Sequence, residues 1–196
     1  MRMVRKTPGQ QWFDTFPVET KLSASSPTAP LVVDIGGGFG HELIALKQAH
    51  PNLSGALIVQ DLSIVIDSIK DLPQGIEAMP HNFFTGQPVK DAAAYYLRAV
   101  LHDWPDKQAH EILANIRVAM GPSSLLLVNK NALPDTHVPL FAAQADMTMM
   151  ACVSALERTQ KQFKTLLEDA GFELIRVWTP QEAGLGAGSI FEAVKK

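Results

Sequence analysis

Short runs of apolar residues alternate along the chain with longer segments in which apolar residues recur every three or four positions. Uninterrupted apolar runs are typical of strands buried on both faces of a parallel sheet, and the wider spacing is typical of amphipathic helices. The runs predict strands at residues 31–35, 56–60, 92–97, 124–128, 172–178 and 189–195. The helical spacing predicts helices at residues 42–50, 63–70, 105–120, 139–151 and 159–170.

This alternation of strands and helices indicates an α/β protein whose mostly parallel sheet is covered by helices on both faces. The last two predicted strands have no helix-length segment between them, so they predict an antiparallel edge strand. The expected architecture is a doubly wound domain over residues 31–196, preceded by an arm and linker over residues 1–30. The arm contains aromatic residues that we expect to pack against another part of the protein: Trp12, Phe13 and Phe16.

The composition is that of a globular protein, with 46% apolar and 19% charged residues. A net charge of −3 provides no positive field to attract nucleic acid or an anionic membrane. No apolar stretch approaches the roughly 20 residues of a spanning helix, and the N-terminus lacks the apolar core of a secretory signal. Cys152 is the single cysteine, which excludes an internal disulfide and suits a reducing compartment. We therefore expect a cytoplasmic protein without a nucleic-acid or membrane partner.

A cluster of glycines follows the first predicted strand and precedes the first predicted helix. Gly36, Gly38 and Gly40 form a G-x-G-x-G pattern, with the acidic residue Asp34 just before it. Glycines at such a turn let a ligand approach bare backbone. A dinucleotide fingerprint needs glycine at its sixth position, which His41 occupies, and the Gly-Lys-Ser/Thr ending of a phosphate loop is absent. The pattern favours a nucleoside without phosphates; a tight connection without a ligand is the alternative.

A second acidic residue, Asp61, ends the second predicted strand about twenty positions after the glycines. A carboxylate at this distance can accept hydrogen bonds from both hydroxyls of a ribose. An ordinary aspartate at a strand end is the alternative, and the glycine pattern makes it the weaker one. We therefore predict that Asp61 and the turn at residues 36–40 hold the same nucleoside.

Together these residues resemble the cofactor site of S-adenosylmethionine-dependent methyltransferases. The resemblance extends through residues 13–22, HNFF (81–84), YYLRAVLHDWPD (95–106), ALPD (132–135) and ERTQKQF (157–163). It identifies the catalytic half of plant and fungal small-molecule O-methyltransferases (the caffeate, flavonoid and sterigmatocystin O-methyltransferases), closest to the fungal type that modifies polyketide-like phenols. The resemblance implies a class I, Rossmann-like methyltransferase sheet of seven strands. It also implies S-adenosylmethionine as cofactor, S-adenosylhomocysteine as product and no metal.

The resemblance further implies methyl transfer to a phenol or enol hydroxyl of a small secondary metabolite. His102, in LHDWPD, matches the family's general base, and Glu157, in ERTQ, matches the acid that hydrogen-bonds this histidine and sets its tautomer. A neutral imidazole suits a phenol, whose pKa lies near about 10 by analogy with tyrosine. From the residues alone, a backbone-bonded histidine and a solvated glutamate remain the alternatives. Asp103 is predicted to cap the following helix.

The other site residues are carried over from the family in the same way. The positions that match its cofactor contacts are Asp34, Gly36, Gly38, Gly40, Asp61, Leu62, Asn82, Phe83 and Arg98. The residues expected to line the substrate pocket are Lys130, Met147 and Met150. Methionines at helical spacing are equally typical of a core. The histidines have no metal-ligand spacing with one another, and we predict no catalytic metal.

Three features depart from the family pattern. Lys130 stands where the family has a second acid, Asn82 replaces an aspartate, and only the arm precedes the first strand where the family has an N-terminal dimerisation domain. If Lys130 pointed at His102, its charge would make the histidine a poorer base. Lys130 could instead bind a phenolate or enolate oxygen, or extend to solvent.

These departures keep two other functions open beside O-methyl transfer. One is a methyltransferase-like enzyme that catalyses a pericyclic or dehydration step with a retained cofactor, whose positive charge assists the reaction. The other is a truncated, non-catalytic subunit that pairs with another chain. Product formation with the cofactor unconsumed would support the first of these functions, and an absence of cofactor binding would support the second. The oligomeric state is left open, because the family's dimerisation domain is largely absent.

Overall fold

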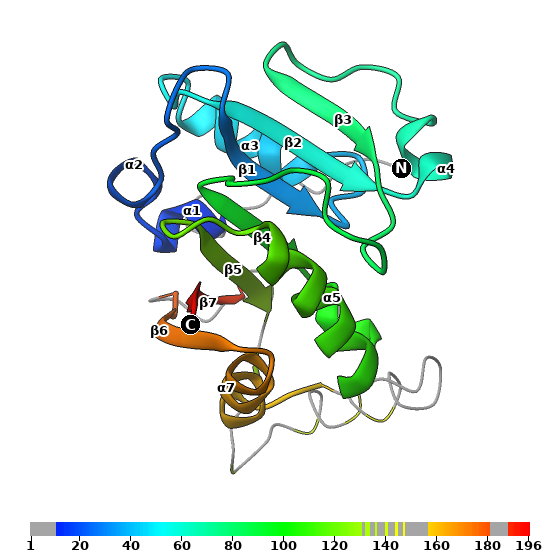
Figure 1. Ribbon diagram of the computed structural model, residues 1–196, viewed down its shortest axis with the longest axis vertical. Coiled ribbons are helices and arrows are strands. Elements are labelled where there is room, and N and C mark those ends of the chain that lie inside the picture. The colour runs from blue at the N-terminus through cyan, green and yellow to red at the C-terminus, as the bar shows by residue number, and fades with distance from the viewer. Residues whose placement is uncertain are drawn as a thin grey trace.

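A seven-stranded sheet forms the centre of the structure (Figure 1). The computed structural model describes residues 11–130, 132–133, 136, 140, 144, 147, 157–180 and 188–196. The strands are β1 (Pro30–Ile35), β2 (Ala56–Asp61), β3 (Ile76–Pro80), β4 (Ala94–Arg98), β5 (Leu125–Lys130), β6 (Phe172–Trp178) and β7 (Ser189–Lys195). Their order across the sheet is β3-β2-β1-β4-β5-β7-β6. Neighbouring strands are parallel except where β7 pairs with β5 and with the edge strand β6. The predicted fold class is confirmed.

One strand, β3, was not predicted from the pattern of apolar residues. It lies at the other edge of the sheet and pairs with β2. Of its five residues only Ile76 is buried, and three are exposed. An edge strand that is covered so little needs no continuous apolar run, so its sequence lacks the signal by which the buried strands were recognised.

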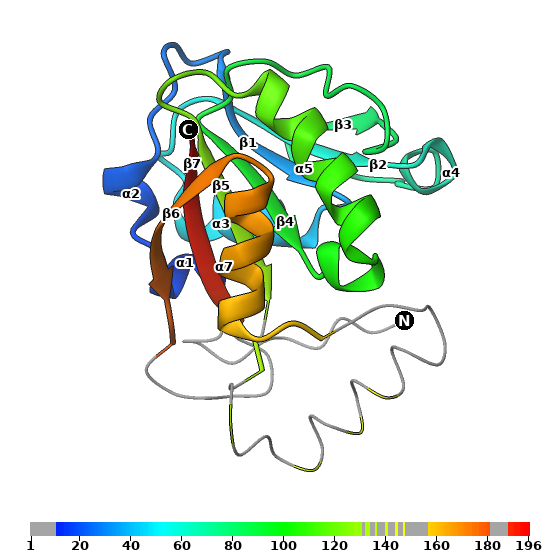
Figure 2. The same ribbon diagram turned by 60° about the horizontal axis from the view of Figure 1, so that its bottom comes forward.

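Helices cover both faces of the sheet, as a doubly wound fold requires (Figure 2). The apolar sides of α5 (Asp106–Ala119) and α7 (Gln160–Asp169) pack on one face. The short helices α1 (Trp12–Thr15) and α2 (Val18–Lys21) and the longer α3 (His41–Ala49) pack on the other. Between β4 and α5 the chain forms one 3-10 turn, η1 (Leu101–Asp103).

Two predicted helices need correction or lie outside the described part of the chain. The helix predicted at residues 63–70 is shorter, since α4 (Ser63–Ile66) ends at Ile66. There the hydroxyl of Ser68 donates to the carbonyl of Val65 at 2.6 Å, a local side-chain bond that competes with helix continuation. The helix predicted at residues 139–151 lies largely outside the described residues.

The start of α7 is fixed by a capping box. The hydroxyl of Thr159 accepts from the backbone N–H of Gln162 at 3.2 Å. In return, the side chain of Gln162 accepts from the backbone N–H of Thr159 at 2.8 Å. These reciprocal bonds satisfy donors that the first helical turn leaves unpaired. The helix therefore begins at a defined residue, shortly after Glu157, which contacts Lys130, and Arg158, which contacts Leu101.

The described part of the arm belongs to the hydrophobic core. Trp12 and Phe16 are buried, and Trp12 stacks on Tyr96 of β4 with 4.6 Å between ring centroids. The expected packing of the arm aromatics is confirmed. A boundary at residue 30 between arm and catalytic domain stays a prediction.

The strand order reverses between β1 and β4, and this switch point places the loops after these two strands next to each other. Strand β1 is flanked by β2, which follows it in the chain, and by β4. Ligands of open α/β sheets bind in the crevice outside the carboxyl ends of the strands at such a switch point. The glycine loop after β1 and the segment with η1 after β4 both leave the sheet there.

Candidate active site

The glycine loop after β1 adopts a backbone conformation that side chains disfavour. Gly36, Gly38 and Gly40 have φ angles of +70°, +57° and +74°. A Cβ atom on Gly36 would also lie only 2.8 Å from a methyl group of Val100. The backbone N–H of Gly36 donates to the carbonyl of Gln60 at 2.8 Å, which ties the loop to β2. The glycines are therefore required by the turn itself, and the turn brings bare backbone to the switch point.

The carboxylate of Asp61 lies against this loop. One of its oxygens accepts from the backbone N–H of Gly38 at 2.9 Å, and the other accepts from the backbone N–H of Leu62 at 2.8 Å. The two parts of the chain that were predicted to hold one nucleoside therefore meet. A Cβ atom added to Gly38 would contact nothing within 4 Å, so the loop faces open space at this residue. Bare backbone beside open space and an acidic side chain fit a nucleoside group.

The acidic residue before the loop, Asp34, is buried in the same place. Its side chain is 1% exposed, and its Oδ2 has no hydrogen-bond partner within the described part of the chain. Burial, together with the nearby carboxylates of Glu42 and Asp61, raises the pKa of Asp34 to about 8, although Arg98 acts in the opposite direction. A cationic ligand near the loop would favour the ionised form of this carboxyl group. This also fits the sulfonium and ammonium charges of the expected cofactor.

The raised pKa of Asp34 predicts an unusual dependence of stability on pH. Between its ordinary value near 3.8 and about 8, the folded protein holds a proton that the unfolded chain releases. The free energy of unfolding should therefore fall with rising pH, by on the order of 1.4 kcal/mol per pH unit from this residue. Urea denaturation from pH 5 to pH 8 should show this component in the wild type and lose it in Asp34→Asn. The exposed Asp67→Asn should keep it, and equal pH slopes in wild type and Asp34→Asn would contradict the assignment.

The loop after β3 supplies an aromatic side chain to the site. Phe83 lies beside the glycine loop, since a Cβ atom on Gly36 would be 3.9 Å from its ring. Phe84 and Trp104 pack edge to face behind it, with ring centroids 4.7 Å apart. The side-chain oxygen of the exposed Asn82 accepts from the backbone N–H of Phe84 at 3.0 Å, so it stabilises its own turn. An aspartate oxygen could make the same bond, so this contact does not distinguish Asn82 from the family's acid.

Arg98, at the end of β4, is engaged in an ion pair. Its guanidinium donates to a carboxylate oxygen of Glu42 in the first turn of α3, directly after the glycine loop. The hydroxyl of Tyr96 also lies within reach of Glu42, at 3.4 Å, and accepts from Asn129 at 2.8 Å. Arg98 thus joins β4 to the start of α3. This ion pair with Glu42 crosses the switch point and positions the start of α3 beside the predicted cofactor residues.

His102 and Glu157, the predicted base and acid, lie together. Nδ1 of His102 is 3.1 Å from Oε1 of Glu157. Nζ of Lys130, at the end of β5, is 3.0 Å from the same Nδ1 and donates to the same Glu157 oxygen at 2.9 Å. The side chain of Lys130 is 17% exposed. Of the orientations considered for this lysine, the structure has the one that points at His102.

The electrostatics of this cluster favour an ionised glutamate. Burial raises the pKa of the Glu157 carboxyl group, but the hydrogen bonds from His102 and Lys130, together with the lysine charge, outweigh it. The net pKa of Glu157 is therefore lowered. On the other side of the ring, Oδ1 of Asp103 lies 3.3 Å from Nε2 of His102. The prediction that Asp103 caps α5 is wrong, because Pro105 is the N-cap residue and no side chain makes a cap bond there.

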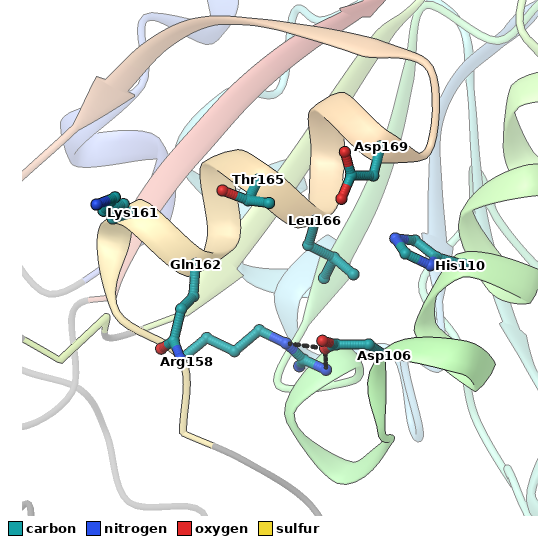
Figure 3. Close-up of a pocket in the computed structure, with 8 residues that line it drawn as sticks. All are labelled: Asp106, His110, Arg158, Lys161, Gln162, Thr165, Leu166 and Asp169. Atoms are coloured by element: carbon teal, nitrogen blue, oxygen red, sulfur yellow. Dashed lines mark hydrogen bonds and ion pairs between the residues drawn. The ribbon is translucent and has the colours of Figure 1, made fainter.

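Arg158 is a site residue that the sequence analysis did not single out. It is 1% exposed, and its guanidinium donates to the backbone carbonyls of Leu101 and Trp104 at 2.7 and 2.8 Å. It also forms two bonds to one carboxylate oxygen of Asp106, drawn in Figure 3, beside a pocket of about 350 Å³ between α5 and α7. The arginine thus holds both sides of the turn that carries His102. The ERTQ motif contains this residue, but no sequence pattern reveals that three acceptors converge on it.

The remaining site predictions can be placed only in part. Leu62 is half exposed at the end of β2, next to Asp61. Met147 is 66% exposed, and Met150 lies outside the described residues. Among the residues that the structure describes, no three His, Cys, Asp or Glu side chains gather where they could hold a metal ion. No helix in the described ranges is both long and apolar enough to cross a membrane.

Comparison with known proteins establishes the family. The family model described as the O-methyltransferase domain matches residues 19–173. This range includes the glycine loop, Asp61, His102, Lys130 and Glu157. The chain therefore belongs to the O-methyltransferase domain family, and the predicted family is confirmed.

Fungal proteins are prominent among its curated relatives. The O-methyltransferase penC of Penicillium thymicola is 42% identical over 94% of this chain and 46% of its own length. Demethylsterigmatocystin 6-O-methyltransferase of Aspergillus flavus is 45% identical over 84% of this chain and 43% of its own length. Its counterpart stcP of Emericella nidulans is 43% identical over 84% of this chain and 80% of its own length. The chain thus spans less than half the length of the first two relatives.

Solved structures with the same fold include cofactor complexes. LepI in complex with SAM has a TM-score of 0.89 at 37% identity, over 99% of this chain and 50% of the other. A second structure with the same values is described as a pericyclic reaction enzyme. OxaC in complex with SAH and oxaline has a TM-score of 0.85 at 36% identity, over 98% of this chain and 49% of the other. The neighbours therefore include complexes with SAM or SAH and a protein described as a pericyclic reaction enzyme.

Proposed function

We propose that this chain is the catalytic part of an S-adenosylmethionine-dependent O-methyltransferase that acts on a phenol or enol hydroxyl of a small secondary metabolite. The single observation that carries the proposal is the meeting of two sites at the switch point of the sheet. The Gly38–Asp61 contact lies on one side of that point, and the His102–Glu157 pair follows the adjacent strand β4. One part is suited to a nucleoside, and the other to moving a proton.

The residues of the cofactor side divide into two roles. The backbone of the glycine loop and the carboxylate of Asp61 would hold the nucleoside, with Leu62 and Phe83 beside it. The buried Asp34 would offset positive charge, and Arg98 would fix the start of α3 through Glu42. The bound cofactor supplies an activated methyl group on its sulfonium, so the protein has to contribute positioning and proton removal.

The residues of the acceptor side would activate a hydroxyl group. When Nδ1 of His102 carries the proton, it would donate to Glu157, 3.1 Å away, and the lone pair of Nε2 would be available as a base. After proton transfer the same carboxylate stabilises the imidazolium. Fungal relatives named as demethylsterigmatocystin 6-O-methyltransferases support an aromatic, polyketide-like acceptor. Lys130, at 3.0 Å from His102, borders the place where this acceptor would lie.

Titration calorimetry with S-adenosylmethionine tests the cofactor assignment before any acceptor is known. The wild-type chain should bind, and Asp61→Ala should weaken binding by roughly 10- to 150-fold, because charged hydrogen bonds contribute about 1.5–3 kcal/mol. Asp67→Ala removes an exposed carboxylate near α4 and should leave the affinity unchanged. An absence of binding heat with the wild-type chain would overturn the proposed function.

A second candidate function is a methyltransferase-like enzyme that retains its cofactor through a pericyclic or dehydration step. Two observations favour it: the high structural similarity to a pericyclic reaction enzyme, and the cation of Lys130 beside the expected base. The two functions differ in stoichiometry. Formation of one S-adenosylhomocysteine per product molecule indicates methyl transfer, whereas product with S-adenosylmethionine recovered intact indicates the second function.

A further inference from the structure

The cluster at His102 contains one more charged group than a histidine–carboxylate pair needs. Nζ of Lys130 lies 3.0 Å from Nδ1 of His102 and 2.9 Å from Oε1 of Glu157, while these two atoms are 3.1 Å apart. The three side chains are only 17%, 15% and 10% exposed, for Lys130, His102 and Glu157 respectively. Water therefore screens this triangle only in part, and each contact affects the other two.

Nδ1 of His102 cannot satisfy both neighbours at once. If Nδ1 carries a proton, it donates to Glu157 and repels the ammonium group, which has donors but no acceptor. If Nδ1 carries a lone pair, it accepts from Lys130, and the proton of a neutral ring must then sit on Nε2. The two arrangements are the two tautomers of the imidazole.

The two tautomers differ in what they offer a substrate. With the proton on Nδ1, the lone pair of Nε2 is free to remove a proton. With the proton on Nε2, that atom is a donor, and the negative charge of Asp103, whose Oδ1 is 3.3 Å away, favours a proton there. The described charged groups that face the ring are thus Glu157 and Lys130 at Nδ1 and Asp103 at Nε2. The nearby guanidinium of Arg158 is turned to the backbone carbonyls of Leu101 and Trp104.

We propose that Lys130 is a positioning residue that controls the tautomer and charge of His102, by competing with it for Glu157 and by donating to its Nδ1. The lysine favours the neutral, Nε2-protonated ring and so restrains the histidine as a base. The effect on turnover rests on the proposed function, whereas the effect on the tautomer of the resting imidazole does not. A lysine in this place makes Nε2 of His102 a hydrogen-bond donor in the resting state. The imidazole must therefore change tautomer before it can remove the proton of the substrate hydroxyl.

The direct test is the ¹⁵N NMR spectrum of the histidine side chains in the folded chain, with the His102 signals assigned by their loss in His102→Gln. In the wild type at pH 7.5, the shifts should indicate mainly a protonated Nε2. In Lys130→Met they should change to mainly a protonated Nδ1, because Glu157 is then the sole described partner of that atom. Lys130→Arg should keep the wild-type shifts, since it restores a cationic donor.

Two further variants keep this result interpretable. Lys130→Leu also removes the donor and should behave like Lys130→Met, which covers the case in which Lys130→Met does not fold. Lys21→Met removes another lysine–carboxylate pair, 2.9 Å from Glu192 on the far side of the sheet, and should leave the His102 signals unchanged. Identical tautomers in the wild type, Lys130→Met and Lys130→Leu would overturn the proposal.

A pH profile of methyl transfer measures the catalytic consequence. In Lys130→Met the repelling charge beside the ring is removed, so the acidic limb of the kcat/KM profile should move to higher pH. Above that limb, kcat should rise severalfold, because the ring is already in the basic tautomer. If the NMR result holds and no methyl transfer occurs with any acceptor, the proposed function fails and the role of Lys130 stands. If transfer occurs with an unchanged limb and unchanged tautomer, the role of Lys130 fails.

Discussion

His102→Ala is expected to lower the turnover number for methyl transfer by about 10²- to 10⁴-fold, the range that a positioned general base contributes. The loss should be confined to the chemical step, because the described contacts of the His102 side chain are with Lys130, Glu157 and Asp103 rather than with the glycine loop. Calorimetric affinity for S-adenosylmethionine should therefore stay within about twofold of the wild type. Single-turnover kinetics with a phenolic acceptor, beside the calorimetry, measure both quantities.

A matched control for this variant is His50→Ala. His50 also pairs with a glutamate, Glu19 at 3.0 Å, but on the opposite side of the sheet. It should retain wild-type turnover. Turnover of His102→Ala close to that of His50→Ala would show that another group removes the proton, and would favour the candidate function without methyl transfer.

Arg158→Met is expected to lower the free energy of unfolding by about 3–5 kcal/mol, since charged hydrogen bonds to two backbone carbonyls are lost inside the protein. The carbonyls of Leu101 and Trp104 flank the residue that carries the proposed base, so turnover should fall as well. Guanidinium denaturation gives the stability. Hydrogen exchange at the amides of residues 101–104 shows whether this turn opens before the rest of the protein.

The comparison that isolates the carbonyl bonds is Asp106→Asn. Its carboxylate is 67% exposed, so its ion pair with Arg158 is screened by water, and its loss should cost no more than about 1 kcal/mol. A cost for Asp106→Asn as large as that of Arg158→Met would mean that the exposed ion pair, and not the turn, depends on the arginine.

The sequence predicted those parts of the site that depend on residue type and on position along a strand. The glycine pattern and Asp61 follow buried strands, and the carboxyl ends of parallel strands meet, so their proximity follows from the fold class. The pairing of His102 with Glu157 was predicted from the family motifs, and the structure has the two side chains in contact. The residues of β3 were missed because an exposed edge strand carries no continuous apolar run.

Other features depend on distances between side chains that no sequence pattern determines. Lys130 had three possible orientations in the sequence analysis, and only its 3.0 Å contact with His102 distinguishes among them. Arg158 stands next to Glu157 in the chain, yet its function depends on three acceptors supplied by residues 101–106. The wrong prediction that Asp103 caps α5 has a related origin. Asp103 belongs to a 3-10 turn that precedes Pro105, and α5 begins at Asp106.

The arrangement of the glycine loop and the histidine on neighbouring strands has a consequence for how such a protein evolves. The proposed contacts with the nucleoside are mostly backbone groups around β1 and β2, whereas the proposed reactive groups are side chains at the ends of β4 and β5 and before α7. Under the proposed function, a single side-chain replacement in the second group would therefore change or abolish the reaction without loss of nucleoside binding. This division of labour lets one scaffold diversify its chemistry in small, individually tolerable steps.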